Sequence, residues 1–143
     1  MSRLYFPLQS AYRRHHTTKT ALIKISNDIF EAVDARKATV LVALDLSAAF
    51  DTINHSVLIS TLEHTLGLGG LALEWVRSYL SGRISFVNIG GERSATTAGA
   101  TGVPQGSVLG PILFLLLISP LSNVIFKYDI QFNQYADDIQ LYK

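Results

Sequence analysis

The sequence predicts an α+β fold, in which helices and antiparallel strands are mixed along one chain. A short apolar run at 39–46 and an alternating segment at 129–143 have the composition of strands. Three further stretches repeat apolar residues at helical spacing. Hairpin signals occur at 84–97 and near 137–138, and hairpins join antiparallel strands, which favours α+β over a parallel βαβ array.

The N-terminal half begins with a predicted helix at 17–36, for which Thr17 or Thr18 is the candidate cap. The run TVLVALDL (39–46) follows. It is short, apolar and β-branched, the pattern of a central strand that is buried on both faces. This predicted strand ends on Asp45.

The middle of the chain is predicted to hold two helices and a hairpin. NHSVLISTLEHTLG (54–67) starts with cap-type residues and stops at Gly67, and LALEWVRSYLSG (71–82) is also closed by glycine. ISFVNIGGERSATT (84–97) contains Gly-Gly between two strand-like runs, so we expect a hairpin with a two-residue turn.

The C-terminal part is predicted to be a glycine-rich loop (98–111), a buried apolar helix (112–119) and a short helical or irregular piece to Lys127. The apolar helix lies between two prolines, and its eight residues are too few for a bilayer, which needs about 20. The last segment, 129–143, is predicted to form two strands joined at Asp137-Asp138.

Composition indicates one ordered domain with a sizeable core, since the 143 residues are 48% hydrophobic and 16% charged. The chain has no cysteine, which excludes disulfides and thiolate zinc sites. MSRLYFPLQS, at the start, lacks the apolar region of a secretory signal. We therefore expect an intracellular protein without a membrane partner.

Charge is distributed unevenly. Residues 1–37 hold seven basic and three acidic residues, a balance of +4, whereas the remainder holds five and eight, a balance of −3. A basic segment beside an acidic remainder indicates an anionic partner on one face. A solvated helix face explains the charge equally well.

Three loci are candidates for chemistry: Asp45 at a strand end, the glycine loop 102–111, and Asp137-Asp138. Each alone could be a cap, a connection or a turn. If the strand ending in Asp45 lies beside the Asp-Asp hairpin, three carboxylates converge, and divalent cations are needed to neutralise them. Oxygen ligands select Mg²⁺ or Mn²⁺, and a pair of such ions serves in-line phosphoryl displacement in polymerases and nucleases.

LVALDLSAAFDTINH, TGVPQGSVLGPILF and QYADDIQLY, in this order and at these separations, closely resemble the palm motifs of reverse transcriptases. The flanking QSAYRRHHTTKTAL and WVRSYLSGR are similar to those of LINE-type, non-LTR retrotransposon enzymes. The resemblance spans Gln9 to Tyr142. It implies a palm-like antiparallel sheet with helices mainly on one face.

The resemblance also implies roles for these carboxylates. Asp45 and Asp137 would be the principal ligands of two Mg²⁺ (or Mn²⁺) ions, with Asp138 as the supporting carboxylate. The reaction would be RNA-directed transfer of dNTPs to a primer 3′-OH, with an RNA template and a DNA primer as partners. We expect the carboxylates to lie within metal-sharing distance.

Nucleotide contacts follow from the same resemblance. Phe50 matches the aromatic gate that excludes a ribonucleotide 2′-OH. Ala48 and Ala49 would lie under the triphosphate, and Gln105 and Gly106 match the loop that packs against nucleotide and template. Glycine permits such close backbone approach to a ligand.

Two departures from the family pattern bear on these expectations. QSAY (9–12) replaces the usual Gln-Ser-Gly-Phe, and Ala11 would be strained if its position requires positive φ. The chain also lacks the family's first fingers motifs, the thumb and an endonuclease domain. We therefore expect a fragment of a longer polyprotein, truncated before the thumb, with a fingers-side basic helical segment at 1–38 and the palm at 39–143.

Two alternatives remain open. The first is a catalytically silent remnant that folds or binds nucleic acid without polymerising. The second is an RNA-dependent RNA polymerase palm, because Asp45 and Asp51 superficially fit a motif in which the second Asp recognises the ribose 2′-OH; Phe50 and YADD favour reverse transcriptase.

Several side chains outside the motifs also carry expectations. Arg13 and Arg14 could contact RNA phosphates or be solvated. Trp75 and Tyr79, four residues apart on one predicted helix, are expected to pack in the core. The four histidines lack metal-ligand spacing with carboxylates and are expected at the surface or in caps.

Overall fold

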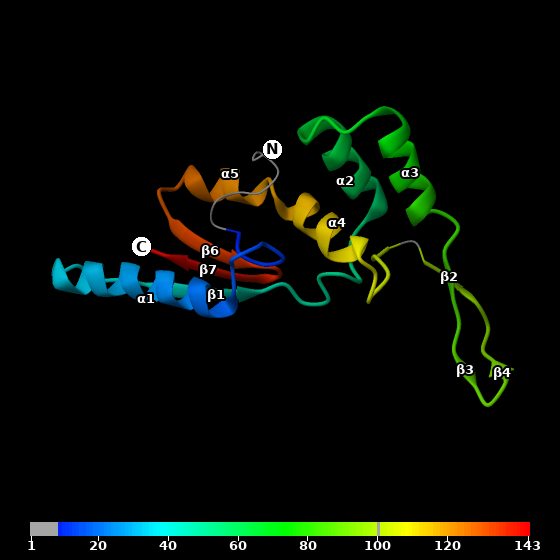
Figure 1. Ribbon diagram of the computed structural model, residues 1–143, viewed down its shortest axis with the longest axis horizontal. Coiled ribbons are helices and arrows are strands. Elements are labelled where there is room, and N and C mark those ends of the chain that lie inside the picture. Colours follow the sequence, from blue (N-terminus) through cyan, green and yellow to red (C-terminus); the bar gives the residue numbers. More distant parts are fainter. Residues whose placement is uncertain (1–8, 100) are drawn as a thin grey trace. The chain divides into compact units, whose positions relative to one another are not determined.

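The computed structural model describes residues 9–99 and 101–143 of the chain (Figure 1). Its contacts divide the chain into two compact units. Unit 1 combines the described part of Met1–Ser47 with Ile118–Lys143, and unit 2 is Ala48–Leu117. The family resemblance predicts a different division, into a fingers-side segment at 1–38 and a palm at 39–143, and this stays a prediction. Residues 1–8 of the fingers-side segment lie outside the described part.

Unit 1 is built on a three-stranded antiparallel sheet. Its strands are β1 (Leu41–Asp45), β6 (Gln131–Tyr135) and β7 (Asp138–Tyr142), in the order β1-β7-β6. The strand that ends at Asp45 therefore lies beside the Asp-Asp hairpin, as the sequence predicted.

Each face of this sheet carries a helix (Figure 1). Helix α1 (Thr18–Asp34) packs over the face of Asn133 and Tyr135, while Phe126 of α5 (Leu121–Phe126) makes an edge-on ring contact with Phe132. Neighbouring strand residues point to opposite faces, so the two helices lie on opposite sides. The α+β class is confirmed, but the expectation of helices mainly on one face does not hold for unit 1, whose sheet has a helix on each face.

Helix α1 starts as its sequence predicted. Thr17 and Thr20 form a reciprocal capping box, in which each side chain accepts a hydrogen bond from the other's backbone N–H. The preceding Ala11 is buried and its φ is not positive, whereas Tyr12 has φ +55°. Alanine in place of the family's glycine at position 11 is thus accommodated without left-handed strain.

The prediction that 39–46 forms a central strand buried on both faces is wrong. β1 is the edge strand, and all five of its residues are exposed. The central strand is β7, where Ile139 is fully buried. An apolar run reports only that a strand prefers burial, while its position in the sheet is decided by pairing with segments far away in the chain.

Unit 2 begins with helical structure over the predicted range. Asn54 caps α2 (His55–Ser60) by accepting from two backbone N–H groups, and a π-helical turn, η1 (Thr61–Thr65), follows. Helix α3 (Gly70–Leu80) matches the second predicted helix. The π turn was not predicted, because it changes hydrogen bonding without changing the apolar spacing.

The predicted hairpin at 84–97 is confirmed as two short ladders. The inner pair is β3 (Asn88–Ile89) with β4 (Glu92–Arg93), and the outer pair is β2 (Ile84–Ser85) with β5 (Thr97–Ala98). Gly90 and Gly91 both have positive φ, as a two-residue type I′ turn requires.

Helix α4 (Leu109–Ile118) starts three residues before the predicted residue 112. Pro111 is tolerated because N–H groups of a first helical turn have no intrahelical partner. The Ser107 hydroxyl accepts from the Gly110 N–H and so satisfies one of these groups.

Residues 109–126 have the length and apolar composition of a membrane span. Core helices of soluble proteins share both properties, so this is weak evidence for a span. Residues 109–126 form two helices, α4 and α5, separated at Ser119-Pro120.

Candidate active site

The predicted catalytic carboxylates come together at one end of the unit 1 sheet. Asp45 is the last residue of β1 and lies directly opposite Asp138, the first residue of β7. Asp138 is also paired with Tyr135, the last residue of β6. Directly opposite residues project from the same face, with Cβ atoms about 4.5–5.5 Å apart. The sheet therefore forms a row of Asp45, Asp138 and Tyr135.

The third carboxylate, Asp137, lies in the turn that joins β6 to β7. The turn residues are Ala136 and Asp137, so the turn is one residue earlier than the predicted Asp-Asp junction, and Asp138 belongs to the strand. Ala136 has φ +57°, as at the first turn position of type II′. The buried Gln134 side chain donates to the Ala136 carbonyl at 3.0 Å and supports this strained turn.

The three carboxylates do not form a ready metal site. Within residues 9–99 and 101–143, no three His, Cys, Asp or Glu side chains are grouped so that they could hold a metal ion, so the expected convergence of three carboxylates is not found. Asp137 belongs to the turn, whereas Asp138 belongs to the strand. Asp45 and Asp138 remain a facing pair of the hard oxygen donors that suit Mg²⁺ or Mn²⁺.

Asp138 also borders a pocket of about 190 Å³ between the sheet and the first turns of α1. Thr18, Ala21 and Ile25 contribute the helix side of this pocket, and Tyr135 and Gln140 contribute the sheet side. The face that carries the carboxylate row is thus the face covered by α1.

In unit 2, the segment that follows Asp45's motif is joined to the glycine loop by backbone hydrogen bonds. The Val103 N–H donates to the Phe50 carbonyl at 2.9 Å, and the Gly102 N–H donates to the Ile53 carbonyl at 2.8 Å. Asn54 and Thr101 form an isolated antiparallel bridge beside them. Two predicted nucleotide-binding segments therefore form one local structure.

The predicted small residues lie in a tight turn. Ala48 has φ +51°, and its carbonyl accepts from the backbone N–H groups of Asp51 and Thr52 and from the Thr52 hydroxyl. Ala49 is buried. A left-handed, non-glycine residue stores strain of about 1 kcal/mol or more, and such strain gathers at functional sites.

Phe50, the predicted gate, is held from one side. Its ring packs against Phe114 of α4 with centroids 4.8 Å apart and planes tilted by 37°. Phe114 is fully buried and Phe50 half-buried, so the core fixes the ring while part of it remains accessible.

Gln105 has a partner that sequence reasoning missed. Its exposed side-chain amide donates to both carboxylate oxygens of Asp51, at 3.0 and 3.1 Å. His55 was also missed: its Nε2 lies 2.7 Å from the Gly102 carbonyl. No pattern in a single sequence indicates pairs that lie about fifty positions apart. Gly106 has φ +77°, and a Cβ built on it would have no atom within 4 Å.

The two predicted nucleic-acid contacts differ in their surroundings. Arg13 is partly buried and donates to the Gln9 carbonyl at 3.0 Å, which gives it a structural bond. Arg14 is exposed.

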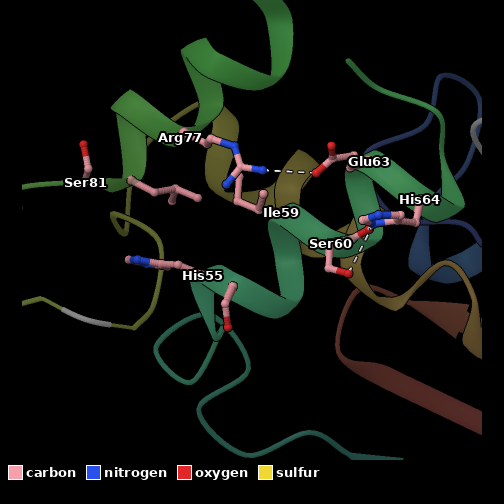
Figure 2. Close-up of a pocket in the computed structure, with 9 residues that line it drawn as sticks. His55, Ile59, Ser60, Glu63, His64, Arg77 and Ser81 are labelled. Carbon is pink, nitrogen blue, oxygen red and sulfur yellow. Dashed lines mark hydrogen bonds and ion pairs between the residues drawn. The ribbon is translucent and has the colours of Figure 1, made fainter. Parts of the chain in front are cut away.

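A pocket of about 400 Å³ lies between α2, η1 and α3 and contains none of the predicted site residues (Figure 2). The Arg77 guanidinium crosses from α3 to the Glu63 carboxylate at 3.1 Å, and His64 Nδ1 is 3.1 Å from the Ser60 carbonyl. Figure 2 shows the His55 side chain at the other end of this pocket. The side chains at its centre are already paired with each other.

Comparisons with known proteins identify the family. Residues 2–143 match the family described as "Reverse transcriptase (RNA-dependent DNA polymerase)". The chain is 33% identical over 135 residues to the "RNA-directed DNA polymerase from mobile element jockey" of Drosophila melanogaster. It is 30% identical over 138 residues to the "Probable RNA-directed DNA polymerase from transposon BS" of the same species. These matches cover 91% and 93% of this chain, but only 14% and 15% of the relatives.

Solved structures support the fold independently. Apo telomerase from Candida tropicalis superimposes with a TM-score of 0.72 and 15% identity, over 95% of this chain and 30% of that one. Telomerase from Candida albicans, solved with a fragment of telomeric RNA, gives the same TM-score and identity over 27% of its length. At this identity the likeness concerns the fold. With the family match over nearly the whole sequence, the chain belongs to the reverse transcriptase family, in the group from LINE-type, non-LTR retrotransposons.

Proposed function

We propose that this chain supplies the carboxylates and the nucleotide-binding loops of an RNA-directed DNA polymerase centre. The observation that carries the proposal is the strand register, in which Asp45 faces Asp138 and Asp137 occupies the adjoining turn. The chain spans about 15% of the length of its curated relatives. Whether the chain polymerises by itself is tested by the first experiment below.

Asp45 and Asp137 act as the principal ligands of two Mg²⁺ or Mn²⁺ ions in this proposal, and Asp138 supports them. When bound, such ions activate the attacking hydroxyl and stabilise the leaving oxygen in a phosphoryl displacement. The residues themselves supply hard oxygen donors at one end of the sheet. Repulsion between these like charges favours the binding of cations.

Nucleotide selection is assigned to the loops of unit 2. Phe50, backed by Phe114, excludes the 2′-OH of a ribonucleotide because its ring cannot retreat into the filled core. Ala48 and Ala49 leave room for a triphosphate, and Gln105 and Gly106 pack against nucleotide and template. Asp51, which an RNA polymerase would use for the 2′-OH, already accepts both hydrogen bonds from Gln105, which favours dNTPs as substrates.

The partners in this proposal are an RNA template, a DNA primer and dNTPs. Arg13 and Arg14 are candidate phosphate contacts, with Arg14 the more accessible of the two. The remainder of a longer retrotransposon polyprotein is a further proposed partner, and the proposed location is intracellular.

The first test measures Mg²⁺- or Mn²⁺-dependent dNTP addition to a primed RNA template by purified chain, with Asp137→Ala alongside. Asp129→Ala is the matched control, because its carboxylate is almost fully exposed and belongs to a surface ion pair. We expect incorporation to fall below detection in Asp137→Ala alone. Equal incorporation by Asp137→Ala would contradict the assigned site. A folded wild type that incorporates nothing would identify the chain as the silent alternative.

The sugar gate has its own test. Phe50→Ala should raise rNTP incorporation relative to dNTP, because the 2′-OH then meets no ring. Phe114→Leu controls for lost packing, since it removes the ring that backs Phe50 and leaves the gate residue in place. If Asp51→Ala changes sugar choice and Phe50→Ala does not, the RNA polymerase alternative is correct.

A further inference from the structure

The outer side of α3 carries a stack of planar groups that the proposed active site does not use. The rings of Trp75 and Tyr79 are nearly parallel, with an interplanar angle of 9° and centroids 5.7 Å apart. The Arg83 guanidinium carbon lies 5.5 Å from the Tyr79 ring centroid, and its Nη1 donates to the Tyr79 carbonyl at 3.3 Å. We refer to Trp75, Tyr79 and Arg83 as the aromatic ladder.

The prediction that Trp75 and Tyr79 pack in the core is wrong for Trp75, which lies at the surface, whereas Tyr79 is half-buried. Helix α3 buries Leu73, Val76 and Leu80, whereas Trp75 is 56% exposed. The Tyr79 hydroxyl is buried without a hydrogen-bond partner among the described residues. An exposed tryptophan on a flat stack leaves a π-face that a ligand can cover.

The hairpin that follows α3 repeats the same combination of ring and guanidinium. Arg93 on β4 lies with its guanidinium carbon 4.7 Å from the ring centroid of Phe86, which is itself exposed. Within unit 2, this hairpin extends away from the end of α3 as a separate arm (Figure 1).

The charge of this surface is only partly neutralised. Arg77 is paired with Glu63 at 3.1 Å, on the pocket side of α3 (Figure 2). Arg83 and Arg93 form no ion pair with a carboxylate anywhere in the described part of the chain. Two guanidiniums without an ion-pair partner among the described residues therefore lie against aromatic rings, that of Arg83 half-buried and that of Arg93 exposed.

We propose that the aromatic ladder and the hairpin bind single-stranded nucleic acid, with an unpaired base stacked on Trp75 and phosphates at Arg83 and Arg93. Each site places a guanidinium against an aromatic ring, and base–aromatic stacking with basic side chains is how proteins bind single strands. This inference rests on the proposed function, since it adds a contact for the strand outside the polymerase centre.

Trp75 is the chain's one tryptophan, so its fluorescence reports directly on the ladder. The experiment titrates the whole chain with an unstructured oligoribonucleotide and, separately, with an abasic oligomer of equal phosphate number. We expect the oligoribonucleotide to quench the fluorescence as it binds, and the abasic oligomer to bind more weakly without quenching. Binding with unchanged fluorescence at saturation would overturn the inference, as would no binding at all.

Variants separate stacking from charge. Trp75→Ala should weaken binding about tenfold, as loss of one stacked base does. Arg83→Gln and Arg93→Gln should each reduce the slope of log affinity against log salt by about 0.7, the value for one phosphate on a single strand. Leu71→Ala, on the same helix and 85% exposed, is the control and should bind as the wild type does.

The outcome is separable from that of the polymerase test. If Trp75→Ala binds the oligoribonucleotide as tightly as wild type while Asp137→Ala abolishes incorporation, this inference fails and the proposed function stands. If wild type incorporates nothing but Trp75 is quenched and Trp75→Ala binds about tenfold more weakly, the ladder stands without the polymerase activity.

Discussion

At the scale of single residues, Gly102 and Gly106 have nearly equal φ angles in very different surroundings. Gly102 (φ +79°) is buried, and a Cβ built on it would lie 2.8 Å from the Asp51 carbonyl oxygen. Gly106 (φ +77°) has no atom within 4 Å of the same position. The pair separates the effect of backbone strain from the effect of a steric clash.

Gly102→Ala should therefore destabilise the chain by about 3 kcal/mol, from about 1–2 for the left-handed backbone and about 1–3 for the overpacked contact. Gly106→Ala should lose only the backbone part, about 1 kcal/mol. Urea unfolding of both variants measures the difference. Equal losses would mean that Asp51 moves aside freely, and that the backbone bonds between residues 50–53 and 102–103 do not fix the loop.

Residue patterns predicted several of these positions and missed others for definable reasons. The turn glycines Gly90 and Gly91 were predictable because their positive φ is intrinsic to a Gly-Gly hairpin. Trp75 was misassigned from its four-residue spacing to Tyr79, although the Leu73, Val76 and Leu80 stripe was visible in the sequence and leaves it outside the core. The bond of Gln105 to Asp51 was out of reach, since it depends on the loop geometry.

At the scale of elements, α1 is attached to β7 by a small polar cluster. Lys24 Nζ lies 2.5 Å from Asp28 and 2.8 Å from the Tyr142 hydroxyl, and that hydroxyl also donates to Asp28. Burial raises the pKa of Asp28, but hydrogen bonds from Lys24 and Tyr142 outweigh it, and the net pKa is below 3.8. Burial and the bond to Asp28 raise the pKa of Tyr142 above 10.0.

These directions predict a stability plateau with two limits. A lowered Asp28 pKa gives stability that is present above its unfolded value near 3.8 and is lost as pH falls through the folded value. A raised Tyr142 pKa gives stability that is present below 10.0 and is lost as pH rises through the folded value. Asp28→Asn should lower the free energy of unfolding by about 1 kcal/mol at neutral pH, a value that allows for the partial exposure of the cluster. It should also reduce the loss of stability at acidic pH, which we call the acid limb.

Chemical denaturation of Asp28→Asn between pH 3 and 11 measures both limits. Asp129→Asn is the control, because the Lys143–Asp129 pair is 3.4 Å apart and largely exposed, and such pairs contribute little. An acid limb that is equally steep in Asp28→Asn and wild type would show that other carboxylates govern acid unfolding.

The sequence predicted which segments form helices and strands better than it predicted which strands pair with each other. Helices α1 and α3 and the β6–β7 hairpin follow from periodicity, caps and turn residues, which are local properties. The edge position of β1 is not local, since β7 pairs with β1 on one side and β6 on the other. The same register that exposes β1 also sets Asp45 opposite Asp138, so the misplaced strand and the correct carboxylate pairing have one cause.

At the scale of the whole molecule, the predicted catalytic and nucleotide-binding residues belong to different units. Asp45, Asp137 and Asp138 lie in unit 1, and Phe50 and Gln105 lie in unit 2. The order of motifs along the sequence predicted the family. It did not predict this division, because contacts of Ile118–Lys143 with the N-terminal segment are long-range.

Unit 1 also leaves an apolar edge exposed. Leu41, Val42 and Leu44 on β1 are each more than 40% exposed, and β1 has one paired neighbour in the described sheet. Its free N–H and C=O groups can pair with the same strand of a second molecule, and the apolar side chains favour that contact. Natural sheets avoid such association by placing charged residues, especially lysine, on edge strands.

The whole chain is therefore expected to self-associate as its concentration rises, and Val42→Lys should reduce this association. Lysine on the exposed edge opposes pairing by charge repulsion and should change unfolding free energy by only about 0.5 kcal/mol. Val57→Lys, an exposed position on α2, makes the same chemical change away from the edge. Sedimentation velocity over a concentration series compares the three proteins. If both lysine variants associate less to the same degree, net charge explains the effect; if only Val42→Lys does, β1 is the surface through which the molecules meet.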